Sequence, residues 1–134
     1  MHRPRSRSLL IAFAAALLVA APACGDDDDD GDAGLGEGAS AAAQEGHGII
    51  LDRGCASCHG ENGEGGIGPA WAGLFGTEEE LDDGTTVLVD EDYIRRSIED
   101  PGAQVVDGFS VSMPENGLTS EEIDAVIAYI RELS

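Results

Sequence analysis

The five residues Cys55-Ala56-Ser57-Cys58-His59 constrain this chain more than any other stretch of its sequence. A C-x-x-C-H sequence is typical of a site where haem c is attached covalently. Each thiol adds to one vinyl group of the haem, and the adjacent histidine becomes an axial ligand of the iron. If haem is attached at Cys55 and Cys58, the chain must also supply a second iron ligand, an apolar pocket and a route out of the cytoplasm.

The same motif has two alternative interpretations. It could be half of a zinc site, or a redox-active C-x-x-C pair. A zinc site needs further ligands, and besides Cys24 the chain offers only His2 and His47. His2 belongs to the N-terminal leader, and His47 is expected on a helix surface, although it could also be a ligand. The haem interpretation is therefore preferred.

Residues 1–23 have the pattern of a signal peptide of the lipoprotein type. Three arginines precede an apolar stretch of about 13 residues, which is shorter than the about 20 residues that a membrane-spanning helix needs. The sequence Ala21-Pro22-Ala23 before Cys24 resembles a bacterial lipobox, which implies that Cys24 is acylated. We expect an exported lipoprotein on the periplasmic side of a bacterial membrane. Ordinary cleavage at the same bond would instead leave a free N-terminal cysteine.

Residues 24–44 are predicted to form a disordered tether. The segment consists mainly of aspartate, glycine and alanine, including an aspartate run over 26–30. Such a segment cannot bury enough apolar surface to offset the entropic cost of ordering it. A metal-binding tract is an alternative interpretation of the aspartates, and a solvated spacer is the preferred one.

The charge of the chain bears on its partners. The formal net charge is -20, with 27 acidic residues against 7 basic ones. This acidic excess argues against nucleic acid as a partner, because binding phosphates needs a basic surface. It is compatible with redox protein partners that have a basic docking surface, and equally with simple solubility.

Residues 45–134 are predicted to form one small helical domain. About 90 residues is small for a self-supporting core, so a covalent haem would add much of the apolar material that is missing. Helices are expected over 45–54, from a cap at Asp90 to Asp100, and after a capping box formed by Thr119 and Glu122. The Asp83-Gly84 pair predicts a short hairpin or loop over 81–89.

Met113 is the predicted second iron ligand. The chain has two methionines, and Met1 leaves with the leader. Met113 precedes Pro114 in a segment, 101–117, that has no helical pattern. Ligation by histidine and methionine is an arrangement used for electron transfer. The alternative is that Met113 is an ordinary side chain of the core.

Residues 44–133 resemble a class I c-type cytochrome. The resemblance is carried, in order, by C-x-x-C-H, Gly68-Pro69, Gly73-Leu74-Phe75-Gly76, Met113-Pro114 and a closing amphipathic helix. It implies an all-α fold of three to four helices wrapped around one covalent haem. Residues 89–98 and Met113-Pro114 resemble, more narrowly, the cytochrome c domain fused to some bacterial haem-copper oxidase subunit II proteins. The copper domain and membrane hairpin of those proteins have no counterpart here, so we interpret the chain as the haem domain alone, with a lipoprotein leader.

The resemblance also implies roles for single residues. The Pro69 carbonyl should accept a hydrogen bond from the ring of His59, and Trp71 and Leu74 should pack against the haem. Many members of the family carry an arginine near a haem propionate at the position of Thr77. Because that arginine is missing here, Arg95 becomes the candidate partner of a propionate.

The predicted function is that of a monohaem one-electron carrier, tethered to a membrane in a respiratory chain and donating to a terminal oxidase. Such a carrier needs no catalytic residues, and we expect no enzymatic activity from the chain by itself. The alternative is a haem c subunit of a dehydrogenase or of another redox enzyme complex. A haem-based gas sensor would need a signalling domain, for which the sequence gives no indication.

Overall fold

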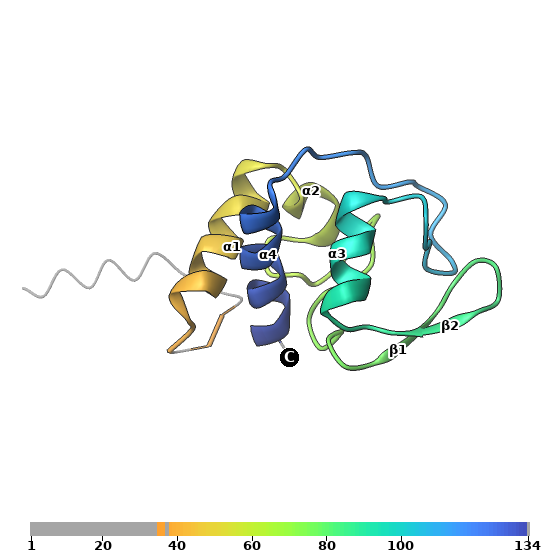
Figure 1. Ribbon diagram of the computed structural model, residues 1–134, viewed down its shortest axis with the longest axis horizontal. Coiled ribbons are helices and arrows are strands. Elements are labelled where there is room, and N and C mark those ends of the chain that lie inside the picture. The colour runs from red at the N-terminus through yellow and green to blue at the C-terminus, as the bar shows by residue number, and fades with distance from the viewer. Residues whose placement is uncertain (1–34, 37, 134) are drawn as a thin grey trace, which may run out of the picture.

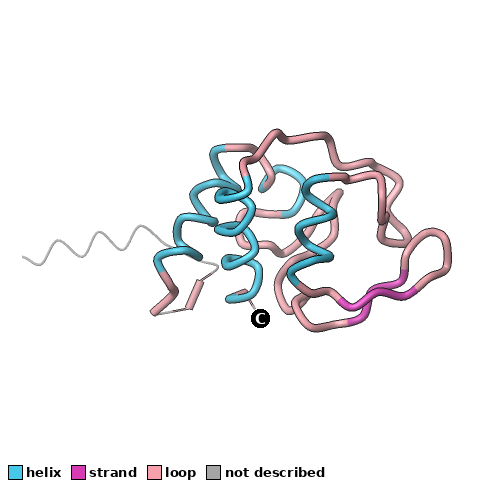
Figure 2. The backbone as a smooth tube through the Cα atoms, in the orientation of Figure 1, coloured by secondary structure: helices cyan, strands magenta, loops and turns pink. Residues whose placement is uncertain are grey.

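A computed structural model of the protein describes residues 35, 36 and 38–133. These residues form the helices α1 (Ala41–Asp52), α2 (Ala56–His59), α3 (Glu91–Glu99) and α4 (Ser120–Glu132), and the strands β1 (Glu78–Glu80) and β2 (Thr86–Leu88). In Figure 1, α4 lies between α1 and α3, and the β1–β2 hairpin projects beyond α3 at the opposite side from α1. Long loops connect these elements (Figure 2). The all-α prediction with a hairpin near 81–89 is confirmed.

Helix α1 begins at Ala41 rather than at Glu45, where the sequence pattern placed its start. Ser40 caps it, since its hydroxyl accepts a hydrogen bond from the Ala43 amide at 3.1 Å. Residues 41–43 are alanines, which favour helix more than any other residue type. The predicted tether therefore ends in helix, and Leu35 within it is also buried against the core. The predicted leader and Cys24 lie outside the described residues.

Helices α1 and α4 pack against each other and run antiparallel. The Ser40 amide at the start of α1 donates to the Glu132 carboxylate near the end of α4, and Arg53 pairs with Glu122 at the other end. The backbones approach closely at Gly46, where a Cβ atom would collide with the carbonyl oxygen of Ala125. This contact requires glycine and joins the two ends of the domain.

The start of α4 shows the predicted capping box. The Thr119 hydroxyl accepts from the Glu122 amide, while the Glu122 carboxylate accepts from the Thr119 amide at 2.8 Å. The apolar face of the helix is buried as the helical spacing predicted. None of the helices in the described part of the chain is both long and apolar enough to span a bilayer.

Helix α3 forms the other side of the core. Its cap is the predicted Asp90, whose carboxylate accepts from the Tyr93 amide at 2.8 Å, and its buried residues are Tyr93, Ile94 and Ile98. The β1–β2 hairpin precedes α3 and lies against residues 105–107 through a bridge between Leu81 and Val106. The hairpin, α3 and the loop after α3 therefore lie around one pocket of the domain.

Candidate functional site

A slot opens between residues 54–74 on one side and residues 101–116 on the other. It has two adjoining halves. One is called the α3 half, because Tyr93 and Ile98 line it, and the other is called the cysteine half, because Cys55 and Cys58 line it. Both halves share five lining residues: His59, Pro69, Val111, Ser112 and Met113.

His59 ends the short helix α2 and is held in one orientation. Its side chain is buried, with 7% of its surface exposed, and its Nδ1 atom lies 2.8 Å from the carbonyl oxygen of Pro69. A carbonyl oxygen can only accept a hydrogen bond, so Nδ1 carries the proton and Nε2 is left to bind a metal. Burial lowers the pKa of His59, and the hydrogen bond to Pro69 opposes this effect. The imidazole is therefore kept neutral, as a metal ligand must be.

Two neighbours fix the plane of this imidazole. The Trp71 ring stacks on it with 4.3 Å between ring centroids and 19° between planes. The backbone of Gly68 lies so close that a Cβ atom there would be 2.9 Å from Cε1 of His59. Short backbone hydrogen bonds hold the glycine-rich loop, including those from the Gly65 amide to the His59 carbonyl at 2.7 Å and from the Trp71 amide to the Gly63 carbonyl at 2.7 Å. Contacts within the chain therefore fix the imidazole on this wall of the slot.

Both cysteines of the motif are free thiols, and each is half-buried beside His59. Burial raises the pKa of Cys55, which favours its protonated form. Among the described residues, no group of three or more histidine, cysteine, aspartate or glutamate side chains could hold a metal ion. The zinc alternative therefore lacks a set of ligands in this part of the chain.

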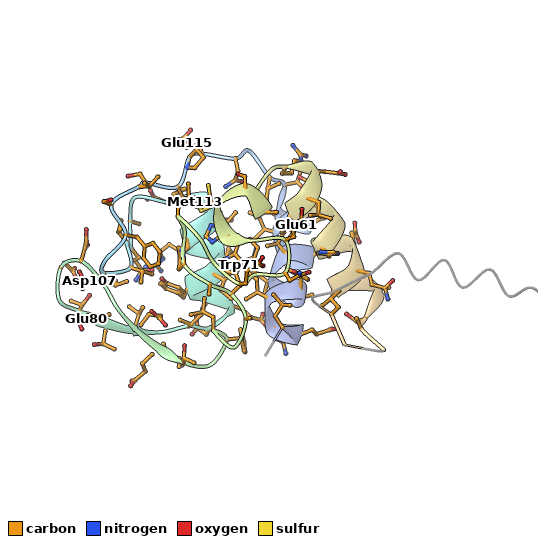
Figure 3. All side chains as sticks on the ribbon, turned by 180° about the vertical axis from the view of Figure 1, so that it is seen from behind. Glu61, Trp71, Glu80, Asp107, Met113 and Glu115 are labelled. Carbon is orange, nitrogen blue, oxygen red and sulfur yellow. The ribbon has the colours of Figure 1, made fainter. Side chains whose placement is uncertain are left out.

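Met113 lies across the slot from this wall. It lines both halves, as His59 does, and it is half-buried against the core. Figure 3 shows Met113 and Trp71 toward the middle of the molecule, whereas Glu80 and Asp107 lie at its edge. The structure thus brings the two predicted iron ligands, which are far apart in the sequence, to one slot.

The sequence was also compared with known proteins. The family model for cytochrome c matches residues 43–134. The chain belongs to the cytochrome c family. A search of curated proteins gives no match to this cytochrome. The family match also confirms the predicted cofactor, haem c, for which Cys55 and Cys58 have the required spacing.

The residues of the slot fit this cofactor. Cys55 and Cys58 would hold the haem covalently, and His59 and Met113 would be the side chains that bind its iron. Leu74, which was predicted to pack against the haem, lines the α3 half together with many other apolar side chains. When bound, the haem supplies an iron centre that gains and loses one electron. The surrounding residues orient the imidazole.

Arg95, the predicted partner of a haem propionate, lies outside the lining of the slot. Its guanidinium pairs with Asp124 on α4. Tyr93, Ile94 and Ser97 of α3 line the slot. Arg95 lies on another side of the helix, where it pairs with α4. The structure therefore gives no support to Arg95 as a propionate partner.

His47 also lies outside the slot lining. It is half-buried on α1, where its Nε2 atom lies 3.2 Å from the Glu61 carbonyl oxygen and its ring stacks on Tyr129. His47 therefore lies on α1, away from the slot, and is less exposed than the sequence suggested.

Several lining residues had no predicted role at the site. The hairpin contributes one of them, and the others come from the loop after α3: Glu79, Gln104, Val105, Phe109 and Val111. The only signal for Glu79 was strand alternation, because the middle residue of a three-residue strand faces the opposite side from its neighbours. The loop has no periodic pattern, so nothing in the sequence indicated which of its residues face inward.

Proposed function

We propose that this cytochrome is a one-electron carrier that is tethered to a membrane on the periplasmic side and donates electrons to a terminal oxidase. The observation that carries the proposal is that His59 and Met113 both line the same slot. With both axial positions of the iron filled by side chains, no position is left for a substrate. Such a centre is suited to outer-sphere electron transfer, in which only the electron crosses between proteins.

The charge distribution supports a basic redox partner. Three arginines of the domain are used in ion pairs with acids of their own chain: Arg53 with Glu122, Arg95 with Asp124 and Arg131 with Glu91. The other acidic side chains of the chain greatly outnumber the remaining arginines. A surface of this kind attracts a cationic partner over long range and accelerates the encounter, to an extent that salt reduces.

The coordination of the iron provides the first test. The mature protein in its reduced form should not bind carbon monoxide at neutral pH, because Met113 occupies the position that carbon monoxide would need. The same protein should be oxidised by membranes that contain a terminal oxidase, with a rate constant that falls as salt is added. Rapid carbon monoxide binding, or turnover of peroxide, would contradict the proposal and favour an enzyme subunit.

The anchor is tested separately, through Cys24. The proposed lipoprotein should partition with membranes, and a Cys24→Ala variant should be found in the soluble periplasmic fraction with an unchanged haem spectrum. Incorporation of labelled fatty acid should be lost in the same variant. A Cys24→Ala protein that remains with the membranes would contradict lipid anchoring but leave the electron-carrier proposal intact.

A further inference from the structure

The chemistry of haem c orients it within the slot. Its two vinyl-derived carbons, which bond to the cysteines, lie on the edge of the macrocycle opposite to the two propionates. The cysteines line only the cysteine half of the slot, and the two candidate iron ligands lie where the halves join. The propionate edge must therefore extend into the α3 half, away from Cys55 and Cys58.

The two propionates are carboxylates, for which cationic side chains would be the expected partners, but the described residues that line the α3 half do not provide them. No lysine or arginine lines it among the described residues, and Arg53 lines only the cysteine half. The polar residues that belong to the α3 half alone are Glu79, Tyr93, Ser97 and Gln104. Three of these four are neutral groups that can donate hydrogen bonds, and the fourth is a carboxylate.

Glu79 reaches this position because it is the middle residue of β1. It pairs with Val87 on β2, and both residues are half-buried, whereas Glu78 and Glu80 on either side are exposed. Glu79 also lies near α3. Burial raises the pKa of Tyr93, and the negative charge of Glu79 adds to this effect.

The other titratable groups around Glu79 are few. Helix α3 presents Tyr93, and the segment 105–109 contains Asp107, which is exposed. Strand β2 contributes no titratable side chain, and the remaining acids on β1 are Glu78 and Glu80, which face solvent. No cation in the lining of the α3 half compensates the charge of Glu79.

We propose that the Glu79 carboxylate faces the propionate edge of the haem and lowers the reduction potential of the iron. On reduction, one electron from a donor converts ferric to ferrous iron, so the charge of the centre falls by one. A fixed negative charge nearby opposes that change, and it does so more strongly in a half-buried, apolar slot than in water. The proposal rests on the haem bound in this slot and is independent of the anchor and of the oxidase proposed above.

The strand itself offers matched variants for the test. The reduction potential of the mature, haem-containing protein is measured by spectroelectrochemistry for the wild type, Glu79→Gln, Glu79→Asp, Glu78→Gln and Glu80→Gln. Glu80 lies at the outer edge of the molecule in Figure 3, so its variant removes the same charge from the same strand without touching the slot. The haem c spectrum is recorded first for each variant, so that a failure to bind haem is recognised before any potential is compared.

Glu79→Gln is expected to raise the ferrous-to-ferric ratio at a fixed applied potential by about threefold to tenfold, where tenfold corresponds to 59 mV for one electron. Glu78→Gln and Glu80→Gln should change the ratio much less, because water and salt screen exposed charges. Glu79→Asp keeps the charge and should remain near the wild type.

Two results would overturn the proposal. One is a potential that is the same in wild type and Glu79→Gln at neutral pH. The other is an equal rise in Glu79→Gln and Glu80→Gln, which would mean that only the total charge of the protein matters. If Glu79→Gln does not mature with haem, Glu79→Ala decides, because that variant also removes the charge and an unchanged potential in it contradicts a role for Glu79.

Discussion

The two walls of the haem slot are built in different ways. The wall that contains His59 is held by its own hydrogen bonds, by the Trp71 stack and by the close approach of Gly68. On the opposite wall, residues 110–114, which include Met113, make no backbone hydrogen bond to any other residue that the structure describes. The nearest fixed point is Asn116, whose side-chain amide donates to the Ile98 carbonyl at 2.9 Å.

This difference indicates how the cytochrome divides the task of coordination. The protein fixes the imidazole before the iron is bound, because every contact that orients His59 is a contact within the chain. The position of Met113 depends on fewer such contacts, so a bond to iron would supply much of its order. One candidate ligand is oriented by the fold, and the other would be ordered by the metal.

The largest expected effect comes from removing the ligand that the fold fixes. His59→Ala should abolish accumulation of the haem-containing protein, since it removes an iron ligand and leaves a cavity beneath Trp71, and truncation of large buried side chains costs about 2–5 kcal/mol. Haem staining and absorbance of periplasmic extracts measure this. Normal amounts of haem protein in His59→Ala would show that this wall is less important than the comparison implies.

Removing the ligand on the other wall should have a smaller effect. Met113→Ala should still yield a covalent haem protein, because the thioethers and His59 remain. Its reduction potential should fall, since methionine ligation raises it, and the weak red absorption band of the methionine–iron bond should disappear. Val111→Ala, at an exposed neighbouring position of the slot, is the control. An unchanged band and potential in Met113→Ala would refute the axial assignment.

Adding one methyl group to a glycine should destabilise the two walls to different extents. Gly68→Ala places a Cβ atom 2.9 Å from the His59 ring and should lower the free energy of unfolding of the haem protein by about 1–3 kcal/mol. Gly102→Ala on the opposite side, where a Cβ atom would meet nothing within 4 Å, should leave it nearly unchanged. Denaturant unfolding monitored by circular dichroism measures both. Equal losses would mean that close packing is not what separates the walls.

The smallest expected effect requires no mutation. In the oxidised protein, the amides of residues 110–113 should exchange with deuterium faster than those of Gly65, Gly68 and Trp71, which are hydrogen-bonded within the loop. Reduction should slow exchange in 110–113 more than in the loop if iron ligation orders that segment. Mass spectrometry or nuclear magnetic resonance measures the rates. The same protection on both walls would contradict the proposed division.

The same contrast explains what the sequence could predict. The wall that contains His59 follows from local signals, namely the C-x-x-C-H motif, the glycine-rich loop and Gly68-Pro69, and the helix caps are equally local. Met113 was predicted by its rarity, because the loop around it has no pattern. The position of Arg95 could not be predicted, because the side of α3 that faces the slot depends on how the helix packs on α4, and Arg95 pairs there with Asp124.

Two further features escaped prediction for related reasons. The start of α1 was set too late because residues 41–43 share their composition with the tether, and only the cap at Ser40 distinguishes them. Glu79 was overlooked because one of three identical neighbouring side chains faces inward, and the sequence does not show which one.

The antiparallel packing of α1 and α4 has a consequence for how the domain folds. The hydrogen bond between Ser40 and Glu132 joins residues that are 92 positions apart, and closing a flexible loop of that length costs on the order of 4 kcal/mol of chain entropy. A haem bonded to Cys55 and Cys58 and ligated by Met113 would divide this loop into shorter ones. Attachment of the cofactor would then lower the entropic cost of bringing the two ends of the chain together, so α1 and α4 should meet more readily after the haem is in place than before.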